Sequence, residues 1–210
     1  MAEVFELEGP EEGPLKAAEE ALSSGGVVVF PTDTVYGLAG RGDLPASTDR
    51  LFETKRRPRH LTLPVLAATV EDAATVAVFD ARASVLARRF WPGGLTLVLP
   101  RTDRTRTWEL GEERETIGVR IPAHQIALTL LAMAGPLAVT SANRSGSPTS
   151  TTCQGIRAAL GDVVAVYLCA GEAPGGVPST VVDLTGAEAR ILREGAIPPA
   201  AVLDAIGQSR

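Results

Sequence analysis

Histidine and cysteine are scarce in this chain of 210 residues, which contains only two of each. His60 and His124 are too few for a histidine-based metal site or a serine–histidine triad. Cys153 and Cys169 form no CxxC motif, so we expect neither a zinc site nor a disulfide, and we expect a reducing cytoplasm. Aromatic residues make up only 4% of the chain, so the core is expected to consist of Val, Leu, Ile and Ala.

Several motifs and targeting signals are also absent. The chain has no GxxxxGKS/T loop, no GxGxxG after its first apolar strand and no GxSxG elbow, so any phosphate must be held by dispersed polar side chains. The acidic N-terminus does not resemble a signal peptide. Residues 126–143 carry no charge, but Gly135-Pro136 interrupts them, which predicts a buried helix and a buried strand rather than a membrane span. The net charge of −5 argues against broad electrostatic binding to nucleic acid.

The apolar periodicity predicts a single α/β domain over residues 1–210. Helices and strands are mixed without strict alternation, which favours a mixed sheet with flanking helices over a doubly wound parallel sheet. The expected helices are 15–23, 47–56, 71–78, 81–90, 124–133, 152–160 and 198–206. The expected strands are 27–30, 61–68, 95–99, 116–121, 137–140, 163–168, 180–184 and 189–193.

Two distant polar clusters stand out from this apolar sequence. Lys55-Arg56-Arg57-Pro58 supplies positive charge, and in an extended segment Lys55 and Arg57 would face one pocket. Ser141 and Asn143 follow an apolar strand and supply hydrogen-bonding groups. Brought together, the clusters suit phosphate and a small polar substrate. The alternatives are a solvated basic helix end and a turn cap, both common uses of such residues.

Four other segments each allow two interpretations. Residues 31–38 follow the first buried strand as either a ligand-binding loop or a turn. Arg120 lies inside a strand, so it either faces solvent or is buried against an anion. Arg193 either pairs with Glu194 at an exposed strand end or binds an anion. The loop from Gly171 to Pro178 is either a connector or a flap over the site.

Seven segments of the chain match one family in its order. They are Phe30–Leu38, Lys55–Pro58, Phe90–Gly93, Val119–Pro122, Ser141–Gly146, Ser179–Asp183 and Ile191–Arg193. The chain thereby resembles the YrdC-like family of threonylcarbamoyl-AMP synthases, from about residue 15 to residue 200. The resemblance implies a twisted α/β fold with a concave basic cavity, here without the extra C-terminal domain of longer members.

The resemblance also implies a reaction and a set of site residues. L-Threonine, bicarbonate and ATP, with Mg²⁺ expected beside ATP, give threonylcarbamoyl-AMP and pyrophosphate. The product serves N6-threonylcarbamoyladenosine synthesis on tRNA, so tRNA or transferase proteins are expected as further partners. No dedicated metal site is expected. The matched residues are Lys55, Arg57, Ser141 and Asn143 for catalysis; Arg57, Thr116, Ser141, Thr149 and Arg193 for ATP; and Thr34, Arg120, Val139 and Ser179 for threonine.

The chain departs from the family at two positions. Leu61 and Leu66 stand where the better-characterised branch has an Asn and a His that contact ATP and threonine, and His60 offers one substitute imidazole. Two alternatives to the synthase remain, and the departure bears on the first of them. One is a paralogue that makes a different carbamoyl adenylate, and the other is a non-catalytic module that binds RNA or nucleotides.

Overall fold

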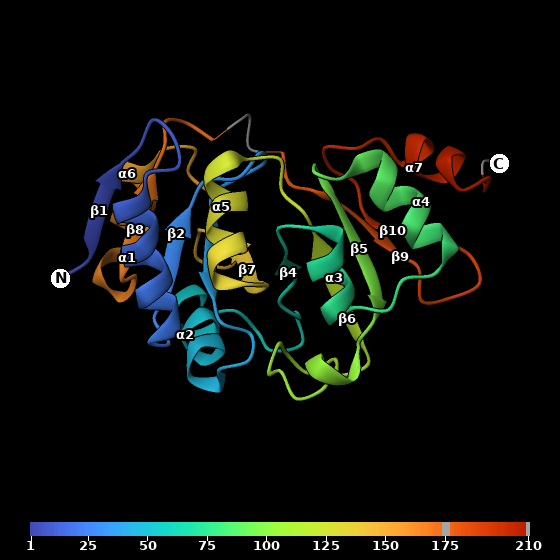
Figure 1. The fold of residues 1–210 in the computed structure, drawn as a ribbon, viewed down its shortest axis with the longest axis horizontal. Coiled ribbons are helices and arrows are strands. Elements are labelled where there is room, and N and C mark those ends of the chain that lie inside the picture. Colours follow the sequence, from blue (N-terminus) through green and yellow to red (C-terminus); the bar gives the residue numbers. More distant parts are fainter. Residues whose placement is uncertain (174–176, 209–210) are drawn as a thin grey trace.

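The computed structural model describes residues 1–173 and 177–208, and it confirms the expected α/β domain with a mixed sheet (Figure 1). The strands hydrogen-bond in the order β1-β8-β2-β3-β7-β4-β6-β5-β9-β10 and combine parallel with antiparallel pairs. Their bounds are β1 (Glu3–Glu6), β2 (Val28–Phe30), β3 (Gly37–Gly40), β4 (Val65–Leu66), β5 (Leu95–Pro100), β6 (Thr116–Arg120), β7 (Leu137–Ser141), β8 (Val166–Cys169), β9 (Thr180–Asp183) and β10 (Arg190–Arg193).

The helices begin close to where the sequence pattern places them. Their bounds are α1 (Glu12–Ser23), α2 (Pro45–Lys55), α3 (Val70–Val76), α4 (Ala81–Phe90), α5 (Gln125–Ala134), α6 (Cys153–Leu160) and α7 (Pro199–Ala205). The side chains of Thr69, Asp80 and Thr152 cap α3, α4 and α6 by accepting from the backbone N–H three residues on. β1 and α7 lie at opposite ends of the long axis (Figure 1).

Two hydrophobic clusters pack on opposite sides of the sheet and determine where a site can form. One cluster joins α1 and α5 to Leu66 and Leu137. The other joins α3 and α4 to Val65, Leu97 and Val119. Because Leu66 pairs with Arg120 in register, the side of the sheet that α5 covers continues onto β6, where it carries polar side chains.

The structure corrects three expectations about strands. β1 and β3 are additional strands. β3 has the sequence GLAG, lies between β2 and β7, and forms the end of the segment expected to be a loop. A Cβ atom on Gly37 would lie 2.8 Å from Val139 Cγ1, so this strand pairing needs glycine. The strand expected over 61–68 shortens to β4, because Leu61 N–H bonds to the Pro58 carbonyl in a turn.

The uncharged stretch forms α5 and β7, as expected. No helix within residues 1–173 and 177–208 is long and apolar enough to cross a membrane.

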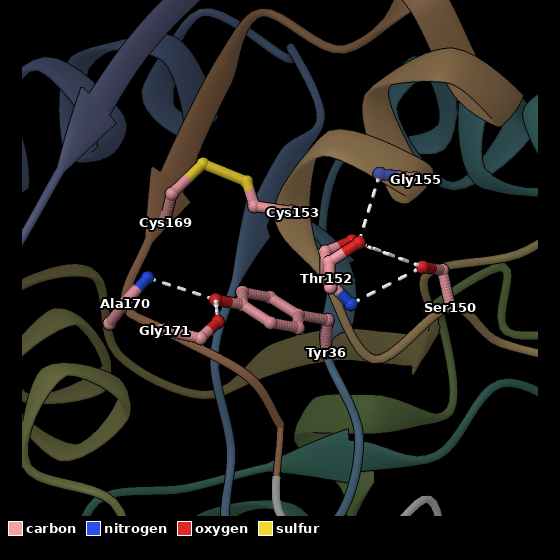
Figure 2. Close-up of a disulfide and its surroundings, with 8 residues drawn as sticks. All are labelled: Tyr36, Ser150, Thr152, Cys153, Gly155, Cys169, Ala170 and Gly171. Carbon is pink, nitrogen blue, oxygen red and sulfur yellow. Dashed lines mark hydrogen bonds between the residues drawn. A yellow bond between two sulfur atoms is a disulfide. The ribbon is translucent and has the colours of Figure 1, made fainter.

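A disulfide joins Cys153 to Cys169, so the expectation that the two cysteines stay unpaired is wrong (Figure 2). The Thr152 cap starts α6 at Cys153, and the end of β8 brings Cys169 to a Cα–Cα distance of 5.5 Å. The spacing of 16 residues along the chain contains no sign of this approach. Beside the bridge, the Tyr36 hydroxyl accepts from Ala170 N–H and donates to the Gly171 carbonyl.

Candidate active site

A cavity with two lobes lies on this polar part of the sheet, with walls that include Thr96 and Arg120. The first lobe has a volume of about 430 Å³ and the second about 330 Å³. They share five wall residues, Arg57, Pro64, Thr96, Ser179 and Arg193. A larger hollow of about 670 Å³ lies between β10 and α7, but none of the predicted site residues lines it.

Most of the predicted site residues converge on this cavity. Those in the walls of the first lobe are Thr34, Arg57, Arg120, Val139, Ser141, Thr149, Ser179 and Arg193. Thr116 lines the second lobe. The residues expected around threonine therefore lie in the first lobe, and those expected around ATP extend through the junction into the second. Lys55 and Asn143 line neither lobe.

Three guanidinium groups, and no carboxylate among the described wall residues, give the cavity its charge. Burial lowers the pKa of Arg57, and the charge of Arg193 lowers it further. Burial also lowers the pKa of Arg193 and of Arg120, although Asp33 partly offsets the shift at Arg120. Like charges held this close are unfavourable alone, so the cavity favours an anionic ligand.

Arg120 is buried against an anion, which decides between its two interpretations. Its Nη2 lies 2.6 Å from Asp33 Oδ1, and its Nη1 donates to Thr34 Oγ1 at 2.8 Å. Asp33 also accepts from Ala123 N–H at 2.9 Å, so the carboxylate anchors the guanidinium to the start of the α5 segment. Sequence reasoning missed Asp33, and its position between two threonines after a buried strand was the available signal.

Arg193 bonds to Ser179 rather than to Glu194. Its Nε and Nη2 donate to the Ser179 carbonyl at 3.0 and 2.8 Å, and Nη2 reaches Ser179 Oγ at 3.1 Å. Ser179 Oγ in turn lies 2.8 Å from Thr96 Oγ1. Sequence reasoning missed Thr96, because a threonine in an apolar strand has no distinctive pattern.

Lys55 and Arg57 do not lie in one extended segment, so that interpretation of the pair is wrong. Lys55 ends α2, and Arg56 takes a left-handed conformation with φ 51°, which turns the chain between the two cations. Arg57 enters the cavity wall and donates to the carbonyls of Leu61 and Thr62 at 2.7 and 3.1 Å. These two bonds hold the turn that replaces the start of the expected strand.

Lys55 lies beneath the turn that follows β7. Its Nζ donates to the Ser141 carbonyl at 2.5 Å, to Asn143 Oδ1 at 2.7 Å and to the Asn143 carbonyl at 2.8 Å. Burial, with a smaller contribution from the charge of Arg57, lowers the pKa of Lys55 to about 7. In this structure Lys55 therefore positions Ser141 at the cavity wall.

The two leucines at the departing positions lie in different surroundings. Leu66 is buried and lines the first lobe. Leu61 and His60 are exposed and line neither lobe, so His60 supplies no imidazole to the cavity walls. Of the loop expected as a connector or flap, residues 174–176 lie outside the described residues, and Pro178 lines the first lobe.

The walls do not provide the oxygen cage that a resident magnesium ion prefers. Within the described part of the chain, no three His, Cys, Asp or Glu residues cluster as metal ligands. The described cavity walls offer hydroxyls and backbone oxygens instead of carboxylates.

Fold and cavity together define an α/β protein whose cavity, lined by three arginines, suits a small anionic ligand. The family model Sua5/YciO/YrdC, described as "Telomere recombination", matches residues 20–195. The chain belongs to this family.

Two curated relatives match nearly the whole chain. A protein of Mycobacterium leprae, named provisionally as a threonylcarbamoyl-AMP synthase, is 39% identical over 99% of this chain and 95% of its own length. The threonylcarbamoyl-AMP synthase of Pyrococcus abyssi is 37% identical over 95% of this chain, and the matched region covers 59% of that protein.

Solved structures extend the likeness to three dimensions. The structure of P. abyssi Sua5 complexed with L-threonine has a TM-score of 0.89 and 34% identity, covering all of this chain and 62% of that one. Escherichia coli YciO has a TM-score of 0.86 and 28% identity, covering 94% of this chain and 98% of its own.

Proposed function

We propose that this protein is a threonylcarbamoyl-AMP synthase, a nucleotidyltransferase that makes threonylcarbamoyl-AMP and pyrophosphate from L-threonine, bicarbonate and ATP. The observation that carries the proposal is the two-lobed cavity, with three arginines and no carboxylate among its described wall residues. A cavity of this charge suits a carboxylate and a polyphosphate together. The names of the Mycobacterium and Pyrococcus relatives, and the threonine complex of P. abyssi Sua5, support the same activity.

Threonine is expected to bind in the first lobe. Arg120 is held by Asp33 and Thr34, and its remaining N–H groups suit the substrate carboxylate. Buried Leu66 and Val139 add apolar wall against which the threonine methyl group can pack. Since Leu66 is apolar, any selectivity for threonine over other amino acids depends on shape and on Arg120 rather than on an imidazole at that position.

ATP is expected to extend from the lobe junction into the second lobe. The threonine amine attacks the bicarbonate carbon and water leaves, which gives a carbamate. A carbamate oxygen then attacks the α-phosphorus of ATP, and pyrophosphate leaves. Negative charge on the phosphates is then best stabilised by Arg57 and Arg193, which flank the junction. The reaction needs no protein nucleophile. Lys55 acts in this scheme by holding Ser141 and Asn143 in place.

Magnesium, the location and the further partners follow from this chemistry. Since the described walls lack a carboxylate cage, Mg²⁺ arrives with the phosphates as part of the ATP substrate. The product, threonylcarbamoyl-AMP, is a labile mixed anhydride that a transferase acting on tRNA consumes. This coupling favours a cytoplasmic location. In that compartment cellular thiols exchange with the disulfide.

The proposal is tested by pyrophosphate release from ATP and magnesium chloride, with L-threonine and bicarbonate omitted in turn. We expect release only when both are present, and threonylcarbamoyl-AMP among the products. Release that is indifferent to threonine would identify a paralogue with another acceptor. ATP binding without release would leave a binding module.

Neighbouring arginines provide a matched pair of variants for this assay. Arg57→Gln removes a cation from the lobe junction and should lower turnover about a hundredfold, as expected for a preorganised charge. Arg56→Gln removes an exposed charge from the adjacent position and should leave turnover within about twofold. Equal rates in the two variants would contradict the assignment of Arg57.

A further inference from the structure

Thr96 lies at the centre of the cavity because of the alternation of β5. Leu95, Leu97 and Leu99 point into the hydrophobic core on one side of the strand. Thr96 therefore points to the other side, where it belongs to the walls of both lobes. The side chain is only 6% exposed, so its hydroxyl needs hydrogen-bonding partners.

The protons of the neighbouring hydroxyls can be counted from their contacts. Ser179 Oγ accepts from Arg193 Nη2, since a guanidinium only donates. A hydroxyl polarised in this way becomes a better donor, which favours Ser179 donating to Thr96 across their 2.8 Å contact. The proton of Thr96 then has no acceptor among the described residues, although the oxygen is buried in the cavity wall.

A second pair of hydroxyls in the first lobe, those of Thr32 and Thr34, has no proton left for a ligand. Thr34 Oγ1 accepts from Arg120 and lies 3.1 Å from Thr32 Oγ1. Thr32 gives its own proton to the Val35 carbonyl at 2.6 Å, so the proton between the two threonines comes from Thr34. Of these two clusters, only the one at the lobe junction leaves a donor for a ligand.

We propose that Thr96 is a further substrate-binding residue, which donates the last hydrogen bond of the chain Arg193–Ser179–Thr96 to an anionic oxygen at the lobe junction. Given the proposed function, on which this step rests, that oxygen belongs to the α-phosphate of ATP, the group that meets the threonine carbamate. The guanidinium of Arg193 at the start of the chain strengthens the terminal donor. Thr96 thus links the α-phosphate to Arg193 through Ser179, besides the charge that Arg193 itself presents at the junction.

The test uses two substitutions at Thr96 in the full chain. Thr96→Val keeps the branched shape and removes the hydroxyl, whereas Thr96→Ser keeps the hydroxyl. Titration calorimetry with ATP and magnesium chloride should show affinity weakened ten- to a hundredfold in Thr96→Val and within threefold of wild type in Thr96→Ser. Affinity for L-threonine alone should change by less than threefold in both. Wild-type ATP affinity in folded Thr96→Val would overturn the proposal.

A double-mutant cycle tests the hydrogen-bonded chain itself. Ser179→Ala interrupts it, so Thr96→Val should add little further loss of ATP affinity in that background. Fully additive losses would overturn the relay. If Thr96→Val does not fold, by its urea unfolding midpoint, Ser179→Ala and Thr96→Ser still decide, because only Ser179→Ala should weaken ATP binding.

The outcome for Thr96 is separable from the outcome for the proposed function. If wild-type protein releases no pyrophosphate and Thr96→Val still loses ATP affinity, the assignment of Thr96 stands and the synthase activity falls. If wild-type protein is active and Thr96→Val binds and turns over ATP equally well, Thr96 alone falls. A wild-type protein that binds no ATP would overturn both.

Discussion

The buried ammonium group of Lys55 makes the stability of this protein depend on pH in a way that one substitution isolates. Lys55 is 2% exposed, and its pKa falls from 10.5 to about 7 through burial and the charge of Arg57. Between these two values the unfolded chain holds the lysine proton more fully than the folded protein does. Raising the pH through this window therefore stabilises the folded state.

The size of the effect follows from the shift. Each pH unit inside the window is worth about 1.4 kcal/mol, so the whole shift corresponds to about 5 kcal/mol. Lys55→Met keeps most of the side-chain volume and removes the titrating group. Relative to this variant, wild-type protein should gain between about 2 and 3 kcal/mol of unfolding free energy from pH 7.5 to pH 9.5.

Urea unfolding of wild type and Lys55→Met at several pH values measures the difference between their unfolding free energies. The other titrating groups are common to both proteins, so their contributions cancel in this difference. Lys16→Met is the matched control, because Lys16 is the other lysine of the chain and its side chain is 68% exposed. Its pH profile should run parallel to that of wild type. Parallel profiles for Lys55→Met as well would refute the reasoning, since they would show that the four oxygen contacts of Lys55 keep it charged.

Three further predictions follow from other contacts. Replacing both Cys153 and Cys169 by serine should lower the free energy of unfolding by about 3 kcal/mol and the melting temperature by about 6–12 °C. If oxidised wild-type protein and the double variant melted at the same temperature, the disulfide would be contradicted. Buried Arg101 donates to four backbone carbonyls, including that of Thr116, so Arg101→Met should lower the free energy of unfolding by about 3 kcal/mol or more. It should also weaken ATP binding more than threonine binding. Arg106→Met, at an exposed arginine, is the control, and equal urea midpoints in the two variants would count against this role. ATP binding near pH 7.5 should take up protons, since a nearby anion raises the pKa of Lys55; a calorimetric enthalpy independent of buffer ionisation would argue that Lys55 does not sense the ligand.

The sequence allowed local elements to be predicted where the pattern is unambiguous. The helix at 81–90 has a capping Asp80 and a Trp-Pro end, and the structure confirms these bounds. The uncharged stretch through Gly135-Pro136 became α5 and β7. β3 was missed because GLAG has no strand propensity, and only its two neighbouring strands give it backbone partners.

The candidate site shows the same division at the level of side chains. Arg57 and Ser141 were predicted from residue types that suit phosphate, and both line the cavity. Asp33 and Thr96 were missed, because their roles depend on contacts with Arg120 and Ser179, which are distant in the chain. Long-range contacts of this kind have no local sequence pattern.

By itself the sequence determined the residue types available for the chemistry, the apolar pattern of a mixed α/β domain and the resemblance to a family of synthases. Only the tertiary structure shows that the chain turns at Arg56, so that Lys55 positions the turn after β7 while Arg57 lines the cavity. It also decided that Cys153 meets Cys169. The physical reason is the same in both cases. The direction of a side chain and its distance from residues far away in the sequence are set by packing and strand register, which the local sequence does not specify.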